Sequence, residues 1–275
     1  MNTKIFNGKA IYQPTGKAAE YSPWACNFYT GCANDCEYCF NKRGVLSHVW
    51  STEPRLKKCF KDEKDAFEIF DKEVIKNKAE LQNTGILFSF TTDPMLPETR
   101  GLTLSAMYDA LTHDVPVQIL TKRADWLSEI VTMIIESSIV EERKNMVAFG
   151  FTLTGFDEKE PGASLNDERI EAMCELHEMG FKTFASIEPV ITPAMSRNMM
   201  EATKDFCDLY KVGLISGKGK NFYNHDHMSH FWYYLAEQMR LGLKIYVKDS
   251  LLKYFNLTRE NLASGWIGSD YNIFN

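Results

Sequence analysis

Three closely spaced cysteines are the residues of this chain best suited to chemistry. Cys32, Cys36 and Cys39 have the spacing C-x3-C-x2-C, and no fourth cysteine follows closely. A structural zinc site usually takes four protein ligands, and an ordinary [4Fe-4S] cluster takes four thiolates. Three thiolates on a four-iron cluster leave one iron open to a substrate or cofactor. The spacing therefore favours a reactive metal site over a structural one.

The composition sets limits on the class of protein. The 275 residues suffice for one large α/β domain or two small ones, and a hydrophobic content of 44% is ample for a packed core. The net charge of −6 argues against an extended surface for duplex nucleic acid, which needs a basic face. No apolar run reaches the ~20 residues of a membrane helix, and residues 1–10 lack an apolar signal stretch. We therefore expect a cytoplasmic protein with no membrane partner, in a reducing compartment that suits a metal better than disulfides.

Short apolar segments alternate with longer amphipathic ones. The pattern predicts strands at residues 85–90, 117–121, 146–153, 181–187, 206–215 and 243–247, and helices at residues 103–112, 125–136, 167–179, 194–204 and 229–240. Asp125 is the expected N-cap of the second of these helices, and Gly180 is expected to close the third. Strands alternating with helices form a parallel sheet. The prediction is an α/β fold, a partial (β/α)6-type TIM barrel with outer helices, and the alternative is a doubly wound open sheet.

Polar residues follow several of these strands, and ligands gather at the C-terminal strand ends in either fold. Hydroxyl groups there could form hydrogen bonds with an amino group or a ribose diol of a ligand. A lysine ammonium could pair with a ligand carboxylate, and an arginine guanidinium could bind a carboxylate through two hydrogen bonds. A purely structural role for each residue also stays open. Threonine is common in strands, Lys122 could be a solvated charge, and Arg169 could pair with Asp167 or Glu171. The candidate ligand-binding residues are Tyr38, Thr91, Thr92, Lys122, Thr152, Thr154, Arg169 and Glu188.

The cysteine spacing, with Tyr38 just before the last cysteine, resembles that of the radical S-adenosylmethionine (radical SAM) superfamily. Within it, the chain looks most like the spore photoproduct lyase-like branch. The similar stretches are NFYTGC at 27–32, SFTTDP at 89–94, LTK at 120–122, FTLT at 151–154, DERIEA at 167–172 and IEPV at 187–190. The resemblance covers about residues 25–215, which leaves about 216–275 as a C-terminal extension of a single domain, 1–275.

The resemblance implies a cofactor set and a reaction. The three cysteines would hold a [4Fe-4S] cluster in a loop near the N-terminus, and SAM would bind the open iron. An electron, supplied by an external donor of flavodoxin or ferredoxin type, would cleave SAM to a 5′-deoxyadenosyl radical that abstracts hydrogen from a substrate. Thr92, Lys122 and Thr152 correspond to residues that hold SAM in the lyase.

The substrate is less defined, because the chain departs from the lyase at one position. The lyase has a hydrogen-donating cysteine immediately before its Thr-Ser-Asp stretch, and Phe90 stands there in this chain. Phenylalanine cannot return a hydrogen atom, so lyase activity itself is not expected. A nucleotide or nucleic acid is the favoured substrate, and a peptide or protein is the alternative. A non-catalytic zinc or iron–sulfur module, with Cys26, His48 or Cys59 as fourth ligand, is the alternative from another class.

Three histidines near the C-terminus invite a second metal site. His225, His227 and His230 do not share one helix face, because helical neighbours are three or four residues apart. The spacing predicts a loop before the helix at 229–240, capped by Asp226 or Ser229. Two roles for these histidines stay open, as ligands of a second metal or as side chains that face the substrate.

Overall fold

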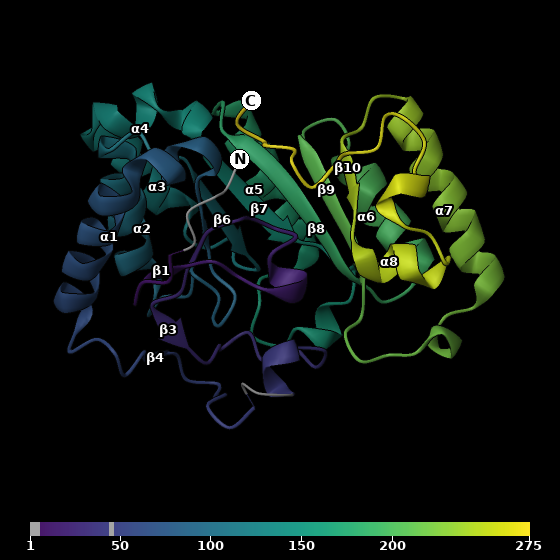
Figure 1. Cartoon of the computed structure of the whole chain (residues 1–275), viewed down its shortest axis with the longest axis horizontal. Coiled ribbons are helices and arrows are strands. Elements are labelled where there is room, and N and C mark those ends of the chain that lie inside the picture. The colour runs from purple at the N-terminus through teal and green to yellow at the C-terminus, as the bar shows by residue number, and fades with distance from the viewer. Residues whose placement is uncertain (1–5, 44–46) are drawn as a thin grey trace.

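The computed structural model describes residues 6–43 and 47–275, so the expectation about residues 1–10 lies partly outside it. An eight-stranded sheet forms its centre, in the order β1-β2-β5-β6-β7-β8-β9-β10 (Figure 1). Only β1 is antiparallel to its neighbour, and all other adjacent pairs are parallel. The strands are β1 (Ile11–Tyr12), β2 (Ala25–Cys26), β5 (Ile86–Phe88), β6 (Val117–Thr121), β7 (Val147–Thr152), β8 (Lys182–Val190), β9 (Leu209–Leu214) and β10 (Ile245–Val247).

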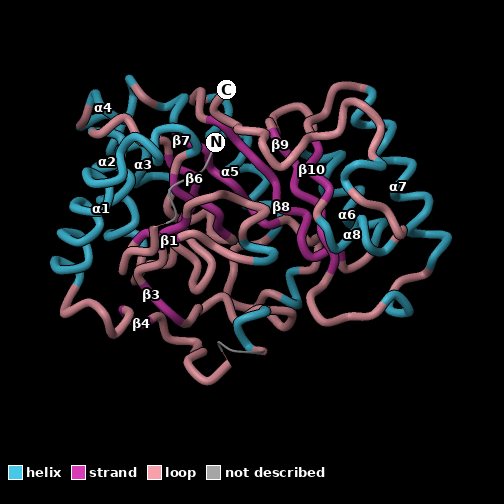
Figure 2. Tube along the Cα trace, in the orientation of Figure 1, coloured by secondary structure: helices cyan, strands magenta, loops and turns pink. Residues whose placement is uncertain are grey.

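Helices follow the parallel strands and flank the sheet, while loops gather beside β3 and β4, in the lower part of the view (Figure 2). Six strand–helix units, from β5 to α8, follow one another, and within the described residues β1 and β10 stay at opposite edges. The predicted α/β fold, with a mostly parallel sheet and flanking helices, is confirmed, and the sheet does not close into a barrel within the described residues. The helices are α1 (Glu63–Thr84), α2 (Arg100–Thr112), α3 (Leu127–Glu136), α4 (Ser138–Glu142), α5 (Asn166–Glu178), α6 (Pro193–Thr203), α7 (His225–Arg240) and α8 (Asp249–Tyr254). A small antiparallel pair, β3 (Tyr29–Thr30) and β4 (Arg55–Leu56), precedes α1.

The central strands are apolar because both of their faces are covered. All six residues of β7 are buried. The Trp126 ring lies 5.0 Å from that of Phe149, so the segment before α3 closes over β7. Gly150 is needed in β7, since a Cβ there would overlap the ring of Phe184 in β8. None of the described helices is long and apolar enough to cross a membrane.

Two sequence-based details of the helices are wrong. Asp125 is not the N-cap of α3; Trp126 holds that position, and the Asp125 carboxylate accepts hydrogen bonds from Arg123 (2.8 Å) and Arg100 (3.2 Å). The second error concerns the start of α7. That helix begins at His225, because Asn224 caps it by accepting a hydrogen bond from the backbone N–H of His227 (3.0 Å). The loop capped by Asp226 or Ser229 does not form, whereas Gly180 follows α5 as predicted, with φ of +90°.

Candidate active site

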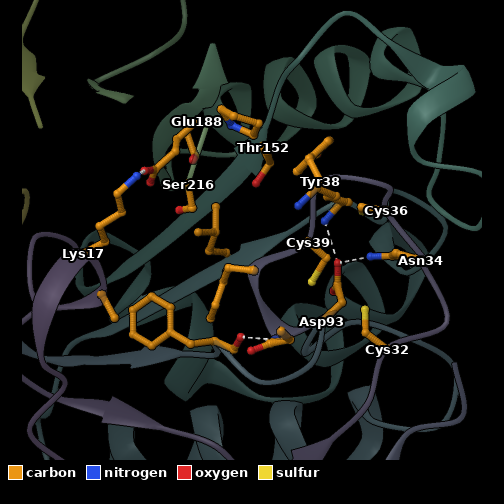
Figure 3. Close-up of a pocket in the computed structure, with 18 of the residues that line it drawn as sticks. Lys17, Cys32, Asn34, Cys36, Tyr38, Cys39, Asp93, Thr152, Glu188 and Ser216 are labelled. Carbon is orange, nitrogen blue, oxygen red and sulfur yellow. Dashed lines mark hydrogen bonds and ion pairs between the residues drawn. The ribbon is translucent and has the colours of Figure 1, made fainter. Parts of the chain in front are cut away.

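A cavity of about 370 Å³ opens at the C-terminal ends of the parallel strands. Figure 3 shows the three cysteines on one side of it and Lys17, Glu188 and Ser216 on the other. The cysteine loop, which follows β3, therefore lies against the strand ends where ligands were expected. The polar and thiol lining residues include Cys32, Asn34, Cys36, Tyr38, Cys39, Asn41, Thr92, Asp93, Lys122, Thr152, Ser186, Glu188 and Ser216.

Asp93 fixes the cysteine loop to the sheet. Its Oδ2 accepts hydrogen bonds from Asn34 Nδ2 and from the backbone N–H of Lys122, both at 2.7 Å. Its Oδ1 accepts from Thr121 Oγ1 (2.6 Å) and from the backbone N–H of Met95 (3.0 Å). One carboxylate thus joins the loop between Cys32 and Cys36 to the ends of β5 and β6. The sequence analysis missed this role, although Asp93 lies in the quoted SFTTDP stretch.

A buried chain of polar groups holds the other end of the cysteine loop. The Tyr38 hydroxyl donates a hydrogen bond to Glu160, and Arg169 Nη2 lies 2.5 Å from the second oxygen of that carboxylate. Arg169 Nη1 donates to the carbonyl of Thr152 at 2.6 Å. The side chains of Arg169 and Glu160 are fully buried. Burial and the charge of Glu160 hold the pKa of Tyr38 well above its usual value, so its hydroxyl stays protonated and donates.

Burial favours the protonated form of two of the three thiols, Cys32 and Cys36. Burial raises the pKa of Cys32 to about 12, and the negative charge of Asp93 adds to the shift. Burial also raises the pKa of Cys36, although the ammonium of Lys122 opposes this. A metal ion or cluster binds thiolates, so it must displace these protons.

The donor set fits an iron–sulfur cluster better than a single zinc ion. A tetrahedral zinc site with Zn–S bonds of about 2.3 Å needs sulfur atoms roughly 3.8 Å apart. Among the described residues, the three cysteines are not a group whose ligand atoms all lie within 4.8 Å of one another. Cys26 is buried in β2, while His48 and Cys59 are exposed, and none of the three lines the cavity. No fourth protein ligand for zinc therefore comes from these candidates.

Five of the predicted ligand-binding residues line the cavity: Tyr38, Thr92, Lys122, Thr152 and Glu188. The hydroxyl of Thr92 is buried without a hydrogen-bond partner and is free to bind a ligand. The Lys122 ammonium lies 5.7 Å from the centre of the Tyr38 ring. Burial acts to lower the pKa of Lys122, but the negative charges of Cys36, once its thiol is ionised, and of Glu160 outweigh it and raise this pKa. Lys122 therefore stays a cation.

Three further predicted residues do not reach the cavity. Thr91 Oγ1 donates to the carbonyl of Tyr29 at 2.5 Å, so it secures the backbone beside β3. Thr154 is fully buried and accepts a hydrogen bond from the backbone N–H of Phe156 (3.3 Å). Arg169 is engaged with Glu160 and the Thr152 carbonyl, as described above. All three hold the backbone around the site.

Asn34 and Asn41 are among the lining residues that the sequence analysis missed, and three histidines lie elsewhere. The Oδ1 atoms of Asn34 and Asn41 are buried without hydrogen-bond partners, and both residues line the cavity. Asparagine in a loop gives no distinctive sequence signal, because it is also common in turns. The exposed residues His225, His227 and His230 lie on α7 and do not line the cavity.

Replacing Arg169 with Met tests the buried chain. The Glu160 carboxylate would stay buried without its cation, so we expect Arg169→Met to lower the free energy of unfolding by about 3–5 kcal/mol. Arg55→Met is the matched control, because Arg55 pairs with Glu53 on the exposed surface; its effect should stay within about 0.5 kcal/mol. Denaturant unfolding measures both variants. Equal effects would contradict the proposed importance of the buried pair.

Alkylation of the metal-free protein tests the thiol protonation. We expect iodoacetamide to modify the exposed Cys59 first and Cys32 far more slowly near neutral pH, because the pKa of Cys32 is about 12. The rate at Cys32 should rise about tenfold per pH unit below that pKa, as the thiolate fraction grows. Mass spectrometry of peptides follows each site. Fast, pH-independent modification of Cys32 would show that its thiol is not protonated as described.

Comparisons with known proteins are informative at the level of fold. No protein-family model matches this chain, and no curated protein matches its sequence. Among solved structures, it is similar to Streptococcus suis SuiB bound to S-adenosylmethionine, with a TM-score of 0.51 and 13% identity over 86% of this chain and 53% of that one. SuiB bound to its precursor peptide SuiA gives a TM-score of 0.51 and 13% identity over 87% and 53%.

The likeness to SuiB alone is nearly the same, with a TM-score of 0.50 and 13% identity over 83% of this chain and 50% of that one. The chain thus spans about half the length of the SuiB chains. Identity this low leaves ligands and reaction open. The comparison shows that the chain has the mostly parallel α/β fold of SuiB.

Proposed function

We propose that this protein is a radical SAM enzyme. It cleaves S-adenosylmethionine reductively and uses the resulting 5′-deoxyadenosyl radical to abstract hydrogen from a peptide or protein. One observation carries the proposal: three thiols lie in a cavity at the strand ends, with no other cysteine or histidine among its described lining residues, together with the unpartnered hydroxyl of Thr92 and the cation of Lys122. The likeness to a protein solved with S-adenosylmethionine supports it.

The residues of this chain have separate roles in the proposal. Cys32, Cys36 and Cys39 hold a [4Fe-4S] cluster, which supplies the electron for SAM cleavage once an external donor has reduced it. Lys122 binds the carboxylate of SAM. The hydroxyls of Thr92 and Thr152 form hydrogen bonds with the polar groups of SAM, as donors or as acceptors. We take residues 1–275 as one domain, because β10, which lies in the extension after residue 215, pairs with β9 of the same sheet.

A peptide or protein substrate replaces the nucleotide that the sequence favoured. SuiB, whose fold the chain shares, has been solved with a precursor peptide. The chain also departs from the lyase at Phe90, which lines the cavity and cannot donate hydrogen as the cysteine of the lyase does. Both observations support the peptide over damaged DNA.

Product analysis tests the proposed reaction. The protein is reconstituted with iron and sulfide without oxygen, then given dithionite and SAM, and 5′-deoxyadenosine should form. Cys36→Ala should abolish the product because it removes a cluster ligand, whereas Cys59→Ala should retain it, since Cys59 is exposed and lies outside the cavity. Chromatography with mass spectrometry measures the product. A colourless protein holding one zinc and making no 5′-deoxyadenosine would refute the proposal.

Deuterium transfer tests the substrate class. Cells grown in deuterated medium supply a peptide and protein fraction and a nucleic-acid fraction, each of which is added to the SAM cleavage assay. Hydrogen abstraction moves one deuterium into 5′-deoxyadenosine and raises its mass by about one unit. We expect this shift with the peptide and protein fraction alone. The shift with nucleic acid instead would restore the nucleotide substrate.

A further inference from the structure

We propose that Glu188 and Lys17 form a recognition pair at the end of the cavity away from the thiols. The pair binds an amide-like edge, in which an N–H donor stands beside a hydrogen-bond acceptor. This inference rests on the proposed function, because the ligand is either SAM or the substrate of the same cavity. Figure 3 shows the two side chains together, across the cavity from the cysteines.

Glu188 has one occupied and one free oxygen. Its Oε2 accepts hydrogen bonds from Lys248 Nζ (2.5 Å) and from the Tyr21 hydroxyl (2.9 Å). Its Oε1 is buried and makes no hydrogen bond, and Lys17 Nζ lies 3.6 Å from it. A buried acceptor without a donor is unfavourable, so a ligand N–H that reaches Oε1 would be bound selectively.

The carboxylate is held firmly in this orientation. Lys248 is fully buried and also donates to the carbonyl of Lys17 at 3.0 Å. Burial and the charge of Glu188 hold the pKa of Tyr21 well above its usual value, so the hydroxyl stays a donor. Gly213 makes room for the side chains of Glu188 and Lys248, because a Cβ at this position would lie 2.9 Å from Glu188 Oε1 and 3.0 Å from Lys248 Cδ. The free oxygen is therefore preorganised for a ligand.

Lys17 supplies the second half of the pair. Its Nζ donates to the carbonyl of Leu214 at 2.9 Å, which occupies one of three N–H donors. Its side chain is 39% exposed and can adjust to a ligand. A donor on Lys17 beside an acceptor on Glu188 matches a neutral edge with the reverse pattern. Glu188 and Lys17 carry opposite charges with Oε1 and Nζ 3.6 Å apart, so their effects on a charged ligand partly cancel.

Two groups within the proposed function carry such an edge. One is the adenine of SAM, where the exocyclic amino group stands beside a ring nitrogen that accepts. The other is the primary carboxamide of an Asn or Gln side chain in a peptide substrate. A backbone amide does not fit as well, because its N–H and C=O point in opposite directions in the trans form.

The experiment compares Glu188→Gln with the control Glu20→Gln. Glu20 belongs to the same ionic network, 3.8 Å from Lys248 and 3.1 Å from Arg259, but it does not line the cavity. Both variants lose one negative charge. Only the first changes the acceptor that faces the ligand, so a difference between them reports recognition and not the network.

The first arm uses SAM and S-inosylmethionine as probes on reconstituted protein. Hypoxanthine reverses the donor and acceptor of the adenine edge. If adenine is the ligand, wild type should bind SAM at least about tenfold more tightly, and Glu188→Gln should lose this preference, because a carboxamide can donate as well as accept. Lys17→Met should weaken SAM binding several-fold and covers the case in which Glu188→Gln does not fold.

The second arm uses N-acetyl-glutamine N-methylamide, with the glutamate compound as its control, on SAM-loaded protein. If a peptide carboxamide is the ligand, ligand-observed NMR should detect the glutamine compound alone, and Glu188→Gln should lose it. The inference is overturned if Glu188→Gln changes neither arm, or if Glu20→Gln changes them equally. If the wild-type protein still binds SAM and forms 5′-deoxyadenosine in that case, only the recognition pair is refuted and the proposed function stands. If the wild-type protein does neither, the proposed function is refuted as well.

Discussion

The hydrogen bonds of one buried carboxylate organise the site. The cysteine loop has almost no regular secondary structure, so its backbone cannot hold itself in place. Asp93 supplies the missing support, because its two oxygens collect donors from the cysteine loop, from its own loop after β5 and from the end of β6. A single side chain can do this because parallel strands end at the same edge of the sheet. The position of the thiols relative to the cavity depends on it.

The polar groups around the cavity divide into two kinds. Some are saturated within the protein, as in the pair of Arg169 and Glu160 and the contact between Lys248 and Glu188 Oε2. Others are buried without partners, including Thr92 Oγ1, Asn34 Oδ1 and Glu188 Oε1. Buried polar groups are normally hydrogen-bonded, so a set of exceptions on the wall of one cavity indicates groups that await a ligand. The saturated groups hold these free atoms in place.

The sequence predicted the longer strands well, but it predicted only some of the side chains that face the cavity. Strands buried on both faces are short apolar runs, which is why the range of β6 was predicted without error. Strands β1 to β4 have two residues each, too few to show a period. Thr91 and Thr92 are adjacent and alike, yet one bonds the Tyr29 carbonyl and the other faces the cavity. That choice is made by contacts with a segment about sixty residues away in the chain, which local patterns do not contain.

The same negative groups act on the thiol loop and on Lys122, a cation that lines the cavity. Burial disfavours the charge of Lys122, but the negative charges of Cys36, once its thiol is ionised, and of Glu160 and Asp93 favour it. Glu160 is in turn held by Arg169 and Tyr38, so the structural chain behind the cysteine loop also tunes the cavity. Metal binding would keep Cys36 as a thiolate and thereby favour the charged lysine beside it. Loading of the thiol site and attraction of an anionic group by Lys122 are therefore linked electrostatically within one wall of the cavity.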